Sequence, residues 1–209
     1  MPIENRLLYS VTLTPQGEQF RIRGVVDSFT FRRVQPGNPD SLTFRNPWHG
    51  IMTSLGRVSS SQLEATACEP DKQIPLQPVH DILIAHPATI AAGAQWKDTT
   101  TTITCRGEVT VSTTAVNSYR MDGPENQRGT PALRITRSSE FTIRGTGRES
   151  GRSVALAGGG GGTTTLYLDQ QRGVLISSNG ETRTVITIRT LAGEIPFRQH
   201  VRQQVTLLP

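Results

Sequence analysis

The chain has 209 residues, of which 34% are hydrophobic and only 5% aromatic, and this supply suits one large β domain whose sheet keeps a polar face. The net charge is +5, but the basic residues, all arginine except Lys72 and Lys97, are spread along nearly every predicted strand and form no dense run. Few aromatic side chains are available to stack on bases, and no apolar stretch reaches the ~20 residues of a membrane span. Composition therefore argues against nucleic-acid binding and against a transmembrane helix.

The first predicted element is a β-hairpin. Residues 8–14 and 19–33 alternate between apolar and polar side chains, as strands do. Pro15 to Glu18 is the predicted turn, with Gly17 at the position that needs a positive φ. The second arm is long, and we expect it to bend at Gly24.

Two irregular regions flank a predicted strand over residues 51–68. The first, residues 35–49, is interrupted by prolines and glycines, and we expect a loop with a short helical turn at residues 40–42. The second, residues 69–93, contains four prolines, and its residues 79–85 fit either a strand or a helical turn.

From Trp96 onward the sequence predicts a meander of strands. Residues 96–106 and 108–121 should pair across Gly107, and Gly123-Pro124 should lie in a polar turn at residues 121–130. Asn179-Gly180 is the strongest type I′ hairpin signal, and the glycine run at residues 158–162 is expected to connect two strands flexibly. The other predicted strands cover residues 132–144, 153–156, 163–169, 174–178, 182–191 and 196–208, with a turn at residues 170–173.

These elements predict one all-β domain over residues 1–209, an antiparallel meander of roughly ten strands with little helix. Strands joined by short turns favour an up-and-down topology. A twisted sheet with so many strands tends to curl or close, because closure removes exposed edges. We therefore expect a barrel or a half-barrel.

The two cysteines, Cys68 and Cys105, lie near the ends of two predicted strands. In a threonine-rich β chain this arrangement favours a disulfide, which would stabilise the fold by roughly 3–5 kcal/mol in the chain-entropy model. The alternative is a pair of buried free thiols, as is common in cytosolic proteins. With two cysteines in all, a closed zinc site of the usual kind is not expected.

Three local patterns carry a resemblance: AAGAQWKD at residues 91–98, LYLD at residues 166–169 and GVLISS at residues 173–178. Together they resemble bacterial exported β proteins, often lipoproteins, that are similar to the LolA/LolB-like lipoprotein-carrier half-barrels. The shared strand–turn–strand pattern falls on Tyr167, Asp169, Gly173 and Leu175. The resemblance implies an envelope location and a concave apolar surface that shields an acyl chain or a partner's apolar segment. The chain departs from that group in showing neither a lipobox cysteine nor a leader.

Phe44, Trp48 and Trp96 are the predicted ligand-binding residues, because aromatic side chains can line the mouth of a concave sheet. The alternative, that they anchor a core or cover a barrel end, stays open. His80-Asp81 with His86 is the sole histidine–carboxylate cluster, and it supplies too few convergent ligands to predict a metal or cofactor.

No catalytic group is identified in the sequence. The glycine-rich stretch at residues 145–153 has the wrong spacing for a phosphate loop and no helix after it, which favours a hairpin turn. There is no nucleophile elbow, and sequence spacing identifies no catalytic carboxylate pair. An enzyme is therefore the less favoured interpretation.

The resulting hypothesis is a non-catalytic cell-envelope protein that binds an apolar or lipid-like ligand in a concave β-sheet. We expect it in the periplasm or outside the cell, with peripheral or no membrane contact; a cytoplasmic location stays open, because the chain shows no leader. The alternative is a structural or interaction module of the cell surface that assembles with a protein partner through sheet edges.

Overall fold

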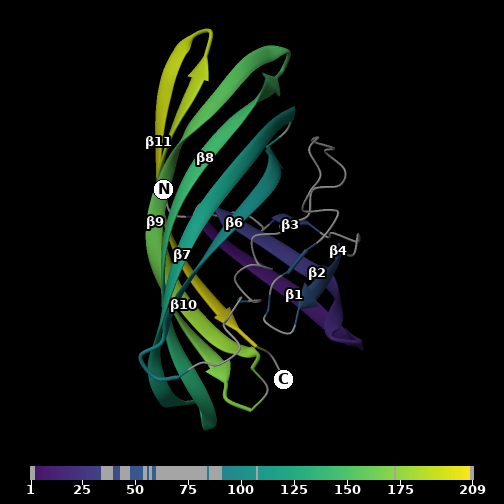
Figure 1. The fold of residues 1–209 in the computed structure, drawn as a ribbon. Helices are drawn as coiled ribbons and strands as arrows, with labels where there is room; N and C mark the ends of the chain where they lie inside the picture. Colours follow the sequence, from purple (N-terminus) through teal and green to yellow (C-terminus); the bar gives the residue numbers. More distant parts are fainter. Residues whose placement is uncertain are drawn as a thin grey trace.

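The structure is a computed structural model, and it describes residues 3–33, 40–42, 48–53, 56, 58–59, 84, 91–106, 108–171 and 173–207. Every regular element in these ranges is a β-strand, and the strands form two antiparallel sheets. Figure 1 shows the larger sheet as a layer of long, bent strands, with the smaller sheet beside it. The predicted all-β antiparallel class is confirmed. No helix in the described ranges could cross a membrane.

The smaller sheet contains the N-terminal hairpin. Its strands follow the order β1-β2-β4-β5, and β3 pairs with β2 farther along the strand than β4 does. Gly17 has a φ of 62° in the turn between the first two strands, as predicted. The strands are β1 (Ile3–Gln16), β2 (Gln19–Arg33), β3 (Asp40–Leu42), β4 (Trp48–Thr53) and β5 (Val58–Ser59).

Two details of this sheet differ from the prediction. The predicted helical turn at residues 40–42 is wrong, because this segment is β3 and pairs with residues 29–31 of β2. An isolated helical turn gains one hydrogen bond for the three residues whose backbone dihedral angles it fixes. Residues 40–42 instead form hydrogen bonds with the edge of β2. The irregularity in the hairpin lies not at Gly24 but at Asp27, which the register skips, and the Ser10 hydroxyl donates to its carboxylate.

The larger sheet is a pure meander, since its strand order β11-β10-β9-β8-β7-β6 is the order of the chain. In the described part of the chain, no pairing joins the first of these strands to the last. The sheet therefore has two open edges and is not a closed barrel. Its strands are β6 (Gln95–Arg106), β7 (Glu108–Gln127), β8 (Thr130–Glu149), β9 (Arg152–Asp169), β10 (Leu175–Thr190) and β11 (Gly193–Thr206).

The predicted turn at Gly123-Pro124 is wrong, because both residues lie inside β7. The register between β7 and β8 skips Asp122, which makes this position a β-bulge, and Gly123 has a φ of 138°. The chain reverses at Arg128 and Gly129 instead, with φ values of 53° and 85°. The predicted antiparallel pairing of the strand that ends at residue 106 with the strand that starts at residue 108 is confirmed, as is that of β9 with β10, and the reversal at Ser150-Gly151 lies within the glycine-rich stretch.

Asn179-Gly180, the strongest hairpin signal in the sequence, is not a turn. The two residues lie within β10 and pair with Thr165 and Thr164 on one side and with Gln204 and Gln203 on the other. A dipeptide favours a turn only by local geometry, whereas here each residue gains ladder partners on both sides. Two predicted strands, residues 174–178 and 182–191, are therefore one.

The glycine run at residues 158–162 also lies inside one strand, β9, rather than in a flexible connection. A Cβ atom at Gly160 would lie 2.0 Å from the Arg183 carbonyl oxygen, and one at Gly158 would lie 2.2 Å from the Val185 carbonyl oxygen. Glycine is needed here because the backbone of β10 approaches too closely for any side chain. Figure 1 shows that β9 bends along its length.

The hydrophobic core is divided into three clusters, and two of them lie on one face of the larger sheet. We call it the inner face: it carries the odd-numbered side chains of β7 and β8 up to the bulge, and the even-numbered ones of β9 and β10. The first cluster comprises Ile84, Tyr119, Met121, Ile135, Leu166, Leu168 and Leu175. The second comprises Val109, Val111, Val154, Leu156 and Ile186. The third belongs to the smaller sheet and packs Ile22 against Tyr9, Val11, Leu13, Met52 and Val58.

We predict that Gly160→Ala lowers the free energy of unfolding by about 3 kcal/mol, because the new methyl group would overlap the backbone of β10 and the ring of Phe141. Gly161→Ala is the matched control, since its Cβ would meet one carbonyl oxygen, that of Ser139, at 3.0 Å. It should cost less than about 1 kcal/mol. Urea unfolding measures both; equal losses would contradict the close approach at Gly160.

Candidate functional site

A groove of about 840 Å³ runs along the inner face of the larger sheet. This volume lies within the range of small-molecule sites, which is ≈300–1,000 Å³. The smaller sheet borders the groove through Gly56 and Val58. The larger sheet contributes Lys97, Asp98, Thr99, Thr100, Thr113, Ala115, Asn117, Tyr119, Arg137, Ser139, Phe141, Ile143, Gly162, Thr164, Ser178, Gly180, Thr182, Thr184, Gln199, Val201 and Gln203.

Glycine explains why this face is hollow at its centre. The inner-facing positions of β9 at the middle of the sheet are Gly158, Gly160 and Gly162, so no side chain rises from the floor there. The ring of Phe141 lies over this floor, since its Cζ atom would be 2.7 Å from a Cβ at Gly160. Gly180 of the neighbouring strand extends the same low floor.

The groove is chemically divided along the strands. The first apolar cluster lies at one end of the inner face and the second at the other, and hydroxyl, amide and charged groups lie between them. We call these central groups the polar belt, and define it as Asp98, Asn117, Arg137, Ser139 and Thr164. The belt crosses β6, β7, β8 and β9 at one level of the sheet.

Hydrogen bonds tie the belt together across neighbouring strands. Asn117 donates from Nδ2 to Asp98 Oδ1 at 2.8 Å and accepts the Ser139 hydroxyl at 2.7 Å. Asn117 is only 7% exposed, so these bonds satisfy a buried amide. Arg137 donates from a terminal nitrogen to the Thr164 hydroxyl at 3.3 Å. The belt therefore contains two hydrogen-bonded groups, Asp98–Asn117–Ser139 and Arg137–Thr164.

Tyr119 joins the belt to the first apolar cluster. Its hydroxyl donates to Asp98 Oδ2 at 3.2 Å, and its ring stacks on Trp96 with centroids 5.1 Å apart and planes 7° apart. Burial raises the pKa of the Tyr119 hydroxyl well above its ordinary value, and the nearby Asp98 carboxylate raises it further. The group therefore stays protonated and acts as a hydrogen-bond donor.

Of the predicted ligand-binding residues, Trp96 is the one whose side chain is described. It lies half-buried against the first apolar cluster, where its stacking on Tyr119 supports the core-anchoring alternative as much as a ligand role. Phe44 lies outside the described residues, and for Trp48 only the backbone, in β4, is described.

The predicted disulfide and the histidine–carboxylate cluster cannot be located, because their residues lie wholly or partly outside the described ranges. Cys68, His80, Asp81 and His86 fall in undescribed stretches, and Cys105 is placed by its backbone alone, in β6 opposite Thr110. Within the described ranges, no group of three or more histidine, cysteine, aspartate or glutamate side chains is arranged to hold a metal ion.

The polar belt was missed by sequence reasoning. The alternation of polar and apolar residues predicted the strands. The belt, however, consists of residues on different strands that become neighbours only through the pairing register. A one-residue slip in any pairing would turn a strand's polar members to the other face. The sequence feature that could have identified the belt is the presence of polar residues, such as Asn117 and Ser139, at positions of the inner face that lie between larger apolar residues.

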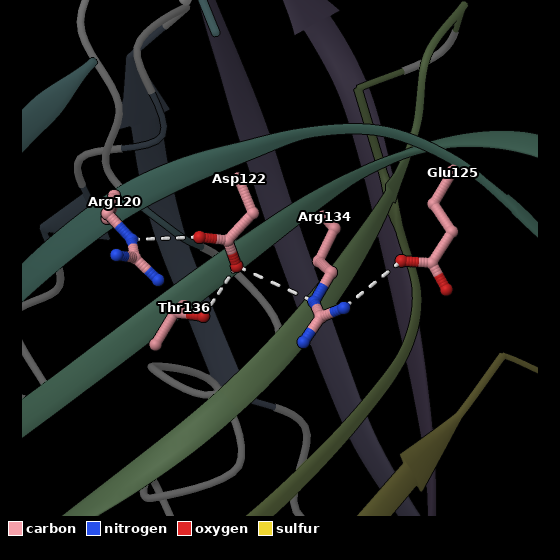
Figure 2. Close-up of polar contacts among 5 residues, drawn as sticks. All are labelled: Arg120, Asp122, Glu125, Arg134 and Thr136. Atoms are coloured by element: carbon pink, nitrogen blue, oxygen red, sulfur yellow. Dashed lines mark hydrogen bonds and ion pairs between the residues drawn. The ribbon is translucent and has the colours of Figure 1, made fainter. Parts of the chain in front are cut away.

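A second polar cluster lies on the opposite face, at the β-bulge of β7. Figure 2 shows Asp122, the extra residue of the bulge, surrounded by donors from β7 and β8. Asp122 accepts the Thr136 hydroxyl at 2.6 Å and Arg120 Nε at 2.9 Å, and Arg134 Nε lies 3.5 Å away. Arg134 also reaches Glu125 at 3.5 Å. These contacts fix the bulge.

The hydrogen bond from Thr136 is the largest cause that holds the pKa of Asp122 below its ordinary value of 3.8, and the arginines act in the same direction. Because every partner lies on β7 or β8 and the groove is on the other face, we assign this cluster to stability rather than to ligand binding.

Comparisons with known protein families, with curated proteins and with solved structures found no match to this chain. The resemblance to lipoprotein carriers therefore stays a prediction.

We predict that Asp122→Asn lowers the free energy of unfolding at pH 7 by about 1 kcal/mol, because the exposed arginine contacts are weakened by solvent screening. The folded protein holds this carboxyl at a lowered pKa, so its stabilisation is present above pH 3.8 and is lost as the pH falls further. The difference between wild type and variant should shrink toward pH 3 in chemical denaturation. A difference that stays constant with pH would contradict this assignment.

Proposed function

We propose that the protein is a non-catalytic carrier or receptor that holds an elongated, lipid-like ligand along the inner face of the larger sheet. The observation that carries this proposal is the groove of about 840 Å³ on that face, which Gly56 and Val58 border from the smaller sheet. Gly162 of β9 and Gly180 of β10 line this groove, so no side chain rises from its floor at those two positions.

In this proposal the larger sheet acts as a half-barrel around its ligand. The long strands and the close approach of β9 to β10 at the glycine run support such a curl, since closely approaching backbones accommodate strong twist and bending. The sheet needs no closure, because the smaller sheet covers part of the inner face through Gly56 and Val58.

The lining favours an amphiphile over a plain hydrocarbon. Ala115, Phe141, Ile143 and Val201 offer apolar contacts, whereas hydroxyls and amides of β7 to β11 alternate with them. A ligand with a hydrocarbon portion and hydrogen-bonding groups would match both parts. A pure alkane would leave the polar groups of the floor without partners, which is costly when they are removed from water.

The polar belt supports a binding role rather than a catalytic one. Asp98, its carboxylate, is held by Asn117 and Tyr119, and the Tyr119 hydroxyl is kept protonated. A general base needs a free lone pair directed at a substrate proton. The belt instead acts as a hydrogen-bonded clamp that fixes the strand positions around the groove.

We further propose that the protein works in the cell envelope, periplasmic or extracellular, where a disulfide between Cys68 and Cys105 would persist. Support comes from the presence of two cysteines in a threonine-rich β chain and from the resemblance to exported lipoprotein carriers.

We predict that delipidated protein binds a fluorescent fatty-acid probe, and that Ala115→Phe weakens this binding at least ~10-fold because the ring fills the groove. Val116→Phe is the matched control: it is the next residue of β7, 44% exposed, and on the opposite face. It should leave probe affinity unchanged.

The proposal would be wrong if the probe does not bind the wild-type protein and native mass spectrometry finds no lipid that co-purifies with it. Equal loss of binding in both variants would place the ligand outside the groove.

We predict that titration with a thiol reagent finds no reactive thiol in denatured, unreduced protein, and two after reduction, because Cys68 and Cys105 are bridged. Two thiols in the denatured, unreduced protein would remove the disulfide and with it one support for an envelope location.

A further inference from the structure

The last strand of the larger sheet is a long edge that no described strand covers. β11 pairs with β10 on one side, and in the described part of the chain nothing pairs with its other side. Residues 193–204 are all exposed. An edge of this length presents a row of backbone groups to any strand that can match it.

Alternate residues of β11 direct their backbone N–H and C=O groups away from β10. Leu207 donates its N–H to the Ile176 carbonyl at 2.8 Å, so the odd-numbered residues of β11 face β10 in the alternating antiparallel ladder. The even-numbered residues, from Glu194 to Gln204, direct their N–H and C=O groups outward. Pro196 lies at an outward position, where its missing N–H costs the β10 ladder nothing.

The side chains of this edge are unusual for a solvated strand. On the inner face, Ile195 is 58% exposed and Val201 is 38% exposed. On the outer face, Glu194, which accepts a hydrogen bond from Arg189 Nε at 2.8 Å, stands near the start of the strand, and Arg202 stands near its end. Opposite charges at the two ends, with apolar residues beside them, make the edge complementary to itself when it is turned around.

We propose that β11 pairs antiparallel with β11 of a second copy of this chain, around a two-fold axis at Arg198. In this register Glu194 lies opposite Arg202 of the second copy, and Ile195 lies opposite its Val201. Because the relation is symmetric, each of these contacts occurs twice. All outward N–H and C=O positions from residue 194 to residue 202 then face one another.

The pairing also completes the groove of the proposed function. Gln199, Val201 and Gln203 of β11 form the open margin of the groove. In the dimer, β11 of the second copy continues the sheet beyond this margin, and its Ile195 covers the exposed Val201. The two grooves then lie on the same side of one continuous sheet.

Two features limit the strength of this pairing. Arg198 stands opposite Arg198 of the second copy at the axis, which places like charges together. Pro196 removes one donor from each half. The interface is therefore modest in size, and we expect a dimer whose population depends on protein concentration.

The test starts with sedimentation and light scattering of the full chain over a wide concentration range. The expected result is a rise toward twice the chain mass of 22.8 kDa. A monomer at every concentration would overturn the proposal. Growth beyond the dimer would overturn it too, because pairing of β11 with β6 of the next copy would form open filaments.

Charge reversal tests the register. Glu194→Arg alone and Arg202→Glu alone should each weaken self-association at least ~10-fold, because each places like charges opposite each other twice. An equimolar mixture of the two variants should form heterodimers, since both pairs between positions 194 and 202 are then attractive. Failure of the mixture to associate, while the wild type dimerises, would overturn this register.

A pair of proline variants tests the use of the backbone edge. Arg198→Pro removes the outward N–H groups at the axis and should abolish the dimer, and Gln204→Pro, at an outward position beyond the paired segment, should keep it. Circular dichroism of both variants shows whether the sheet is intact. If dimerisation survives Arg198→Pro, the contact does not run through β11.

Discussion

The close approach of β9 to β10 is the constraint on which the rest of the molecule depends. Carbonyl oxygens of β10 occupy the space where Cβ atoms of Gly158, Gly160 and Gly162 would stand. The absence of side chains in this run lets the two strands come together, and Gly162 at its end lines the groove. Five consecutive glycines inside a strand that is paired on both sides therefore set the spacing of the strands next to the groove.

The polar belt compensates for what the glycine floor removes. A sheet with a hollow centre lacks the side-chain packing that normally fixes the relative position of its strands. The bonds from Asn117 to Asp98 and Ser139 tie three strands together at that level, and the Arg137–Thr164 contact reaches the fourth. The two apolar clusters pack the ends of the same face. Order at the centre thus comes from hydrogen bonds, and order at the ends from apolar burial.

Sequence reasoning succeeded where the signal was local. The alternation of polar and apolar residues predicted the strand class, and the turns predicted at Gly17 and Gly173 match places where the chain reverses. The prediction was wrong where glycine is required by contacts between strands that are distant in the sequence. Gly180 and the run at residues 158–162 look like turns in isolation, yet neighbouring strands many residues away require glycine there.

The candidate site was harder to predict than the fold, because a site of this kind is defined by register. Trp96 was identified from its residue type, and the structure places it beside the belt rather than on the floor of the groove. Asp98, Asn117 and Ser139 carry no motif. They become neighbours only when three strands align, and a single sequence does not contain that alignment.

The meander has a consequence for how the molecule assembles and opens. Each strand of the larger sheet contacts its chain neighbours, so the order of the sheet can grow one hairpin at a time with short loop closures. Stability in such an array is a sum over adjacent pairs, and the terminal member has one such pair instead of two. In the monomer, β6 and β11 should therefore exchange their amide hydrogens through the openings of lowest free energy, while β8 and β9 exchange through those of highest free energy.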